Sequence, residues 1–173
     1  MLYTRRGDKG KTTLYCCQEK LSKSAAVIEA MGTLDELCSL LGVVKVAAKK
    51  DKFVAAELHE AQENIFTIQA MLAGANKKFG TEKIVELEAT INAIEKKLPP
   101  IKSFMIPGGT ELGALLDYAR AVCRRAERRA VALPKKYHLS AEALIYLNRL
   151  SSLLYALARL ANCKIKEKAP TYQ

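Results

Sequence analysis

The sequence predicts an all-α protein, a five-helix antiparallel bundle formed by a single domain. Half of the 173 residues are hydrophobic, but only 6% are aromatic and none is tryptophan. The apolar content is mostly Ala and Leu, which favours helix over sheet. From residue 24 onward, apolar residues recur at steps of three and four, with no strand-like alternation of any length. A chain of this length most often forms one domain with a substantial core.

Residues 1–23 are polar, basic and rich in glycine, so they predict a loop or an extended arm. The helical pattern covers residues 24–163, and residues 164–173 form a charged tail. The domain 1–173 is therefore predicted to consist of an arm, a helix bundle and a short tail.

Five helices are predicted within this bundle, each bounded by local stop signals. The first spans 24–49 and the second 52–74, which ends where Gly74 occurs. The third spans 81–97, with Thr81 as a candidate N-cap and a Pro-Pro pair that prevents continuation. The fourth spans 110–132, and the fifth, capped by Ser140, spans 140–163. Short loops between such helices are typical of an antiparallel bundle.

Charge and composition narrow the classes of function. The net charge of +10 and a pI near 9.4 favour an anionic partner: a nucleotide, a nucleic acid or a membrane surface. No apolar run is long enough to span a membrane, and no signal-peptide pattern opens the chain. Five cysteines without a C-x-x-C spacing disfavour a disulfide framework or a zinc site and indicate a reducing cytoplasm. Two histidines, neither in an E-x-x-H arrangement, disfavour a di-iron centre.

The stretch "YTRRGDKGKTT" at residues 3–13 has the composition of a phosphate-binding loop. A Walker A loop is excluded, because its first glycine would fall on Arg5 and no apolar strand precedes it. The RGD tripeptide is taken as a chance occurrence. Glycines that let backbone N–H groups crowd around an anion, with lysines to neutralise it, remain compatible with phosphate binding. A solvated basic arm is the alternative interpretation.

Residues 120–129, "RAVCRRAERR", place five arginines within ten residues of the fourth helix. Arg120, Arg124 and Arg128 share one face, and Glu127 is positioned to pair with Arg124 at i,i+3. A solvated charged face is one interpretation. The planar guanidinium, which binds phosphate in a bidentate manner, favours an anion site instead.

Three further positions are candidates with an alternative structural explanation. Asn148, in "YLNRLSSLLYALARL", either fixes the register of the bundle or contacts a base or ribose. Gly32, in "MGTLDEL", indicates a close approach, most simply of another helix, with Asp35 nearby as a surface acid. Phe104, in "FMIPGG", is either a core residue beneath a loop or the hydrophobic wall of a ligand site.

Taken together, five segments resemble the PduO-type ATP:cob(I)alamin adenosyltransferases. These are "TRRGDKGKTTL", "EAMGTLDEL", "FMIPGG", "RAVCRRAER" and "YLNRLSSLLYALAR", in that order between Tyr3 and Arg159. The resemblance implies a five-helix bundle that forms a homotrimer with active sites between subunits. It also implies transfer of the 5′-deoxyadenosyl group of ATP to the cobalt of reduced cobalamin, with release of triphosphate and formation of adenosylcobalamin.

The same resemblance assigns residues to the site. Asp35 and Arg120 match a family salt bridge beside the cobalamin, and Phe104 matches the aromatic that displaces the lower axial ligand of cobalt. Arg124 and Arg128 are implied to stabilise the departing triphosphate together with magnesium. The remaining nucleotide contacts match Thr4, Gly7, Asp8, Lys9, Gly10, Lys11, Thr12, Lys23, Arg125, Glu127 and Asn148.

The resemblance further implies ATP, cobalamin and magnesium as ligands, an electron-donating flavoprotein, a cobalamin-dependent acceptor enzyme, and neither nucleic acid nor membrane as a partner. Three positions depart from the family pattern: Ser152 replaces Asp, Val27 replaces Arg and Cys38 replaces Asn. Two alternatives therefore stay open. One is a catalytically impaired regulatory or structural bundle, and the other is a basic helical protein that binds nucleic acid.

Overall fold

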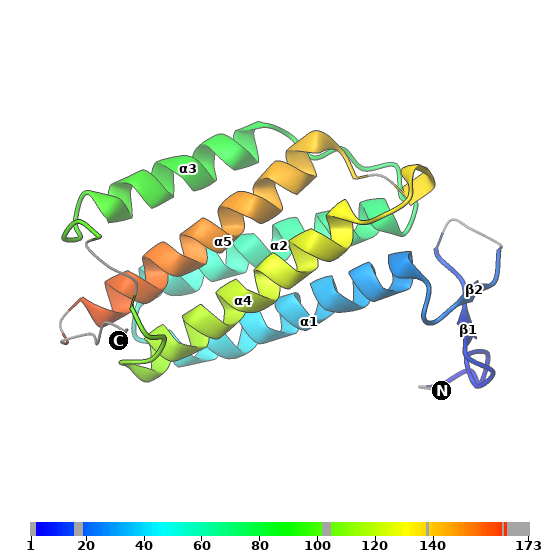
Figure 1. The fold of residues 1–173 in the computed structure, drawn as a ribbon, viewed down its shortest axis with the longest axis horizontal. Coiled ribbons are helices and arrows are strands. Elements are labelled where there is room, and N and C mark those ends of the chain that lie inside the picture. Colours follow the sequence, from blue (N-terminus) through cyan, green and yellow to red (C-terminus); the bar gives the residue numbers. More distant parts are fainter. Residues whose placement is uncertain (1–2, 16–18, 102–104, 138, 164, 166–173) are drawn as a thin grey trace, which may run out of the picture.

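The computed structural model describes residues 3–15, 19–101, 105–137, 139–163 and 165. Phe104 and nearly all of the predicted tail therefore lie outside the described residues. In these ranges the chain forms five α-helices, and the predicted helical bundle is confirmed (Figure 1). They are α1 (Ala26–Ala47), α2 (Lys52–Leu72), α3 (Glu82–Glu95), α4 (Glu111–Val131) and α5 (Ala141–Asn162). A 3₁₀ turn, η1 (Lys135–Tyr137), lies between α4 and α5.

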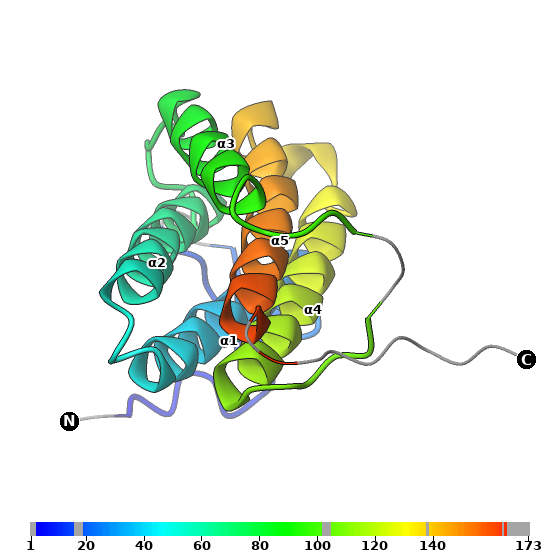
Figure 2. The ribbon, with the colours of Figure 1, turned by 90° about the vertical axis from the view of Figure 1, so that its left-hand side faces the viewer.

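The last helix in the sequence, α5, occupies the centre of the bundle, with the other four around it (Figure 2). It packs against α4, α3 and α2, while α1 packs against α2 and α4. Successive helices alternate in direction, so the neighbours α3 and α5 run the same way (Figure 1). Leucines of α5 at steps of three and four are fully buried: Leu147, Leu150, Leu154 and Leu157. The apolar seam predicted for this helix thus forms the middle of the core.

Every predicted helix boundary lies within two residues of the observed one. Side chains cap three helices: Asp51 accepts from the amide of Val54 at 3.1 Å, and Ser140 accepts from that of Ala143 at 3.3 Å. Thr110 caps α4. The capping role predicted for Thr81 is wrong. Its backbone is already helical, with φ −66° and ψ −24°, whereas a capping side chain needs an extended residue.

The N-terminal arm contains a small antiparallel hairpin that its composition did not predict. Strand β1 (Lys11–Thr12) pairs with β2 (Leu21–Ser22), and the amide of Lys23 donates to the carbonyl of Gly10 at 2.9 Å. The side chain of Leu21 is buried against the helices, as is that of Leu14. These two leucines attach an otherwise exposed arm to the bundle at the N-terminal end of α1 (Figure 1).

The last turn of α5 holds both ends of the connection between α3 and α4. Asn162 donates from Nδ2 to the carbonyl of Gly108 at 2.9 Å. Its Oδ1 accepts from the amide and the hydroxyl of Thr110, at 3.0 and 2.9 Å. At the other end, Arg159 Nη2 donates to the carbonyl of Pro99 at 2.6 Å. Within the described residues, no helix is both long and apolar enough to cross a membrane.

Candidate functional site

The arginines of α4 are divided between two faces of the helix. Arg125 and Arg129 face α1, where Arg125 pairs with Glu36 and Arg129 pairs with Glu29 at 4.0 Å. Arg124 and Arg128 each precede one of these residues by one position, and the helical period places them on the side of α4 that faces α5. Helix α1 therefore neutralises two of the five arginines.

Arg124 and Arg128 are exposed, and neither forms an ion pair with any described residue. Among the described residues, Arg128 Nη1 donates to the carbonyl of Arg124, at 3.3 Å. The pairing expected between Arg124 and Glu127 is not formed, because Glu127 Oε1 accepts from Asn148 Nδ2 at 2.9 Å. Two adjacent guanidinium groups are left with donors directed at solvent, which is the arrangement that binds a polyanion.

These arginines line two cavities between α4 and α5, which together we call the α4–α5 groove. Its charged end has a volume of about 420 Å³ and is lined by Arg124, Glu127, Arg128, Val131, Ala132 and Asn148. Its apolar end has a volume of about 400 Å³ and is lined by Ile101, Met105, Arg120, Arg124, Ser151, Ser152 and Tyr155. Arg124 lines both ends. The two cavities share this residue, so together they can hold an anion beside a largely apolar ligand face.

A separate hollow, the arm cavity, lies where the N-terminal hairpin meets α1. Its volume is about 470 Å³, and it is lined by Thr12, Lys23, Ile28, Glu29, Gly32, Thr33 and Glu36. A Cβ atom added to Gly32 would meet nothing within 4 Å. The close helix crossing expected at Gly32 is therefore wrong, because this glycine opens onto the arm cavity and not onto another helix.

The hairpin gathers several of the glycines and lysines expected to bind nucleotide. A Cβ atom on Gly7 would lie 3.0 Å from Lys23 Nζ, so these two residues nearly touch. Gly10 has a φ of +70°, a conformation that favours glycine, and it precedes Lys11 at the start of β1. Thr4, Asp8 and Lys9 lie on the exposed turns before it.

Arm and groove are not joined within one chain. The described residues that line the groove come from α4, α5 and the segments flanking them, and none comes from the arm. The α1 acids Glu29 and Glu36 line the arm cavity and contact α4 from the opposite side. The two halves of the expected nucleotide site therefore face different directions in a single copy.

The expected ion pair between Asp35 and Arg120 is also absent within one chain. Arg120 Nε instead contacts Asp117 Oδ1 at 3.3 Å, one turn earlier on the same helix. Asp35 is exposed on α1. Burial raises the pKa of the Cys38 thiol, and the negative charge of Asp35 raises it further. Of the positions that depart from the family pattern, Val27 and Cys38 are buried in the core, whereas Ser152 is exposed in the groove.

Several residues at or beside the site were missed in the sequence. Arg149 donates from Nη1 to Asn148 Oδ1 and from Nε to Glu88 Oε1 of α3, both at 2.8 Å. Its position next to Asn148 was visible in the motif, but its partner lies 61 residues earlier in the chain. Tyr155 and Ile101, at the apolar end of the groove, were likewise not predicted, whereas Met105 belongs to the "FMIPGG" segment that was expected as a hydrophobic wall.

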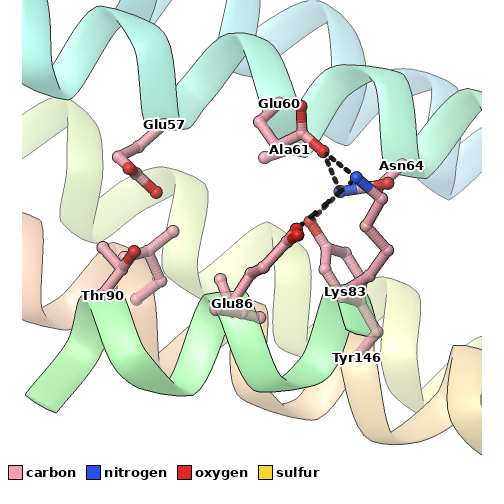
Figure 3. Close-up of a pocket in the computed structure, with 10 residues that line it drawn as sticks. Glu57, Glu60, Ala61, Asn64, Lys83, Glu86, Thr90 and Tyr146 are labelled. Atoms are coloured by element: carbon pink, nitrogen blue, oxygen red, sulfur yellow. Dashed lines mark hydrogen bonds and ion pairs between the residues drawn. The ribbon is translucent and has the colours of Figure 1, made fainter. Parts of the chain in front are cut away.

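A smaller cavity of about 150 Å³ lies between α2, α3 and α5 (Figure 3). Lys83 of α3 pairs with Glu60 of α2 at 2.8 Å across it, and the hydroxyl of buried Tyr146 accepts from Asn64 at 3.1 Å. Burial raises the pKa of that hydroxyl. No predicted site residue lines this cavity, and its contacts fasten α3 to the bundle. Across the described residues, no group of three or more His, Cys, Asp or Glu side chains is arranged to hold a metal ion.

Comparison with known proteins places this arrangement in a family. The family model for cobalamin adenosyltransferase matches residues 2–161. The chain is 39% identical to the corrinoid adenosyltransferase PduO of Citrobacter freundii over 91% of this chain, but it spans only 49% of that protein. It is 37% identical to the human corrinoid adenosyltransferase MMAB, over 94% of this chain and 69% of that protein. With the Bacillus subtilis corrinoid adenosyltransferase it shares 36% identity, over 94% of this chain and 87% of that protein.

The fold is also that of solved relatives. A variant PduO-type ATP:corrinoid adenosyltransferase from Lactobacillus reuteri, complexed with cobalamin and ATP, superposes with a TM-score of 0.86 at 35% identity, covering 94% of this chain and 91% of that one. A second variant of it, complexed with ATP, gives a TM-score of 0.85. The fold of this chain is thus that of solved PduO-type ATP:corrinoid adenosyltransferases. The chain belongs to the cobalamin adenosyltransferase family.

Proposed function

We propose that this chain transfers the 5′-deoxyadenosyl group of ATP to the cobalt of reduced cobalamin. The observation that carries the proposal is the position of two guanidinium groups, Arg124 and Arg128, that form no ion pair with a described residue. They lie at the charged end of a groove whose other end is apolar. A polyphosphate suits the charged end, and the face of a corrinoid ring suits the apolar end. Relatives named for this activity, and solved relatives that hold both ligands, support the same assignment.

In the proposed reaction, the protein contributes mainly positive charge and the positioning of the two substrates. The cobalt electron pair forms a bond to the 5′ carbon, the bond from that carbon to oxygen breaks, and its electrons leave with triphosphate. The leaving group gathers negative charge, which preorganised arginines stabilise without reorganising. No general base is needed, in keeping with a groove that contains no histidine among its described lining residues.

Magnesium enters the proposal as the ion that accompanies the phosphates of ATP. It usually binds phosphate oxygens, one or two carboxylates and water, not a cage made of protein side chains. We assign no residue of this chain as its ligand. The arm residues supply further anion contacts: backbone amides near Gly7 and Gly10, and the ammonium groups of Lys9, Lys11 and Lys23.

The separation of arm and groove supports a site shared between neighbouring copies of a homotrimer. In that assembly the arm of one subunit meets the groove of the next, and Asp35 is free to pair with Arg120 across the interface. The test is to mix Lys11→Ala subunits with Arg124→Ala subunits. Hybrid trimers should recover part of the activity that each variant lacks alone, and a strictly monomeric protein in light scattering would disprove the shared site.

Phe104 is proposed to displace the lower axial ligand of cobalt by its shape and hydrophobicity. An electron-donating flavoprotein and a cobalamin-dependent acceptor enzyme complete the proposed partners, in the cytoplasm. Free thiols at the three cysteines that the structure describes support a reducing location.

The deciding experiment incubates the protein with ATP, magnesium and chemically reduced cobalamin and follows the cobalamin spectrum. Arg124→Ala and Arg128→Ala should each lower turnover or ATP affinity by about 30-fold, or ~2 kcal/mol, the range for charge-assisted hydrogen bonds. Lysine at either position should restore activity only in part, since its ammonium lacks the bidentate fork. Lys83→Ala, which removes a positive charge outside the groove, is the matched control.

The outcome also separates the alternatives. No spectral change in the wild type, despite ATP binding, would favour a catalytically impaired bundle. Salt-dependent DNA binding without preference for ATP would favour a nucleic-acid-binding protein.

A further inference from the structure

A chain of four side chains links α3 to the charged end of the α4–α5 groove. Glu88 of α3 accepts from Arg149 Nε, and Arg149 Nη1 donates to Asn148 Oδ1, both at 2.8 Å. Asn148 Nδ2 then donates to Glu127 Oε1 at 2.9 Å. The bond to Arg149 fixes which end of the Asn148 amide is the acceptor, so the opposite end must present its N–H₂ group to Glu127.

The position of Glu127 matters because of its neighbours on α4. It lies three residues after Arg124, a spacing at which two helical side chains can meet, and it lines the charged end of the groove together with Arg124 and Arg128. At i,i+3 an Arg–Glu pair normally attracts. In this structure the carboxylate turns to α5 instead, and neither arginine forms an ion pair with a described residue.

We infer that Arg149 is a positioning residue for anion binding in the groove. It holds Asn148, which holds Glu127 away from the two arginines that are needed by the ligand. Without Arg149, the Asn148 amide is free to turn and Glu127 is released to neutralise Arg124. The carboxylate then competes with the incoming polyanion for the same guanidinium donors.

Glu88 extends this role to α3. The side chains of Arg149 and Glu88 are each 44% exposed, so without its partner each would be solvated and would sample several rotamers. Pairing them limits the orientations of Arg149 and keeps its second donor on Asn148. Helix α3 thereby affects a site to which its own side chains do not contribute.

The test uses inorganic triphosphate, which binds without adenosine contacts, and isothermal titration calorimetry at low ionic strength. Arg149→Ala should weaken triphosphate binding by up to about fivefold, the range expected when a carboxylate competes for an exposed arginine. Arg149→Lys should recover part of the loss. Glu88→Ala should give a smaller loss, and Glu88→Gln, which retains the acceptor oxygen, almost none. Lys83→Ala is the matched control, because Lys83 also joins α3 to a glutamate at 2.8 Å and carries one positive charge.

A double-mutant cycle separates positioning from direct contact. In the Glu127→Gln background there is no competing charge, so Arg149→Ala should cost no more than the Lys83→Ala control. An equal loss in both backgrounds would mean that Arg149 contacts the ligand itself or is merely structural, and it would overturn the inference. No loss on Arg149→Ala in the natural background would overturn it as well.

This inference rests on the proposed anion site, and the two fail differently. If Arg124→Ala binds triphosphate as tightly as the wild type, the proposed function fails, and the positioning role fails with it. If Arg124→Ala loses binding but Arg149→Ala does not, only the positioning role fails. Glu88→Ala, an exposed substitution, keeps the test decisive should Arg149→Ala fail to fold.

Discussion

Replacing Asn162 with alanine should destabilise the bundle far more than its place in the last turn of a helix indicates. The side chain is 2% exposed and makes three hydrogen bonds to the segment that begins α4. Each such bond contributes about 0.5–1.5 kcal/mol net, and the carbonyl of Gly108 and the amide of Thr110 lose buried partners. We therefore expect the free energy of unfolding to fall by about 2–4 kcal/mol, a large part of the ~5–15 kcal/mol typical of a domain.

The measurement is guanidinium denaturation followed by circular dichroism, at one fixed protein concentration because an assembled protein unfolds in a concentration-dependent way. Asn92→Ala, an exposed asparagine within α3, is the control and should change stability by less than about 0.5 kcal/mol. Asn162→Asp keeps the acceptor but loses the bond to Gly108, so its deficit should be smaller at acidic pH, where the carboxyl is neutral. A loss below about 0.5 kcal/mol in Asn162→Ala would show that these bonds do not hold the segment.

Three further predictions concern single positions. Burial raises the pKa of the Cys123 thiol from near 9 to about 12, so as the pH rises the thiol ionises in the unfolded chain before it ionises in the folded one. The free energy of unfolding should therefore fall by about 1.4 kcal/mol per pH unit between pH 9 and 12. Denaturation curves of Cys123→Ala should show a smaller dependence on pH. Gly32→Ala should stabilise α1 by about 0.5–1 kcal/mol because the added methyl meets open space, while a lowered ATP affinity would show that the arm cavity holds the nucleotide. Phe104→Ala should leave ATP binding nearly unchanged and slow the reaction from cob(II)alamin more than that from cob(I)alamin; equal slowing from both starting states would rule out a role in ligand displacement.

Local sequence signals were sufficient for the helices and their ends. Apolar steps of three and four located all five helices, and Ser140 was correctly assigned as a cap because its hydroxyl bonds to an amide three residues away. Such signals depend on interactions within one or two turns, which the linear sequence contains in full. Thr81 shows their limit: it is a favourable residue type at the right position, but its backbone is helical and its side chain makes no capping bond.

Only the tertiary structure shows which arginines of α4 remain available to bind an anion, because composition does not reveal their partners. Five arginines in ten residues form one motif in the sequence, but Arg125 is neutralised by Glu36 of α1, whereas Arg124 forms no ion pair with a described residue. Glu127 appeared to be the partner of Arg124 and instead bonds to Asn148 of α5. Arg149 bonds to Glu88, on a helix distant in sequence, and the role proposed for it depends on that contact. A helix period places a side chain on a face, but only the packing of several helices determines which opposite charge that face meets.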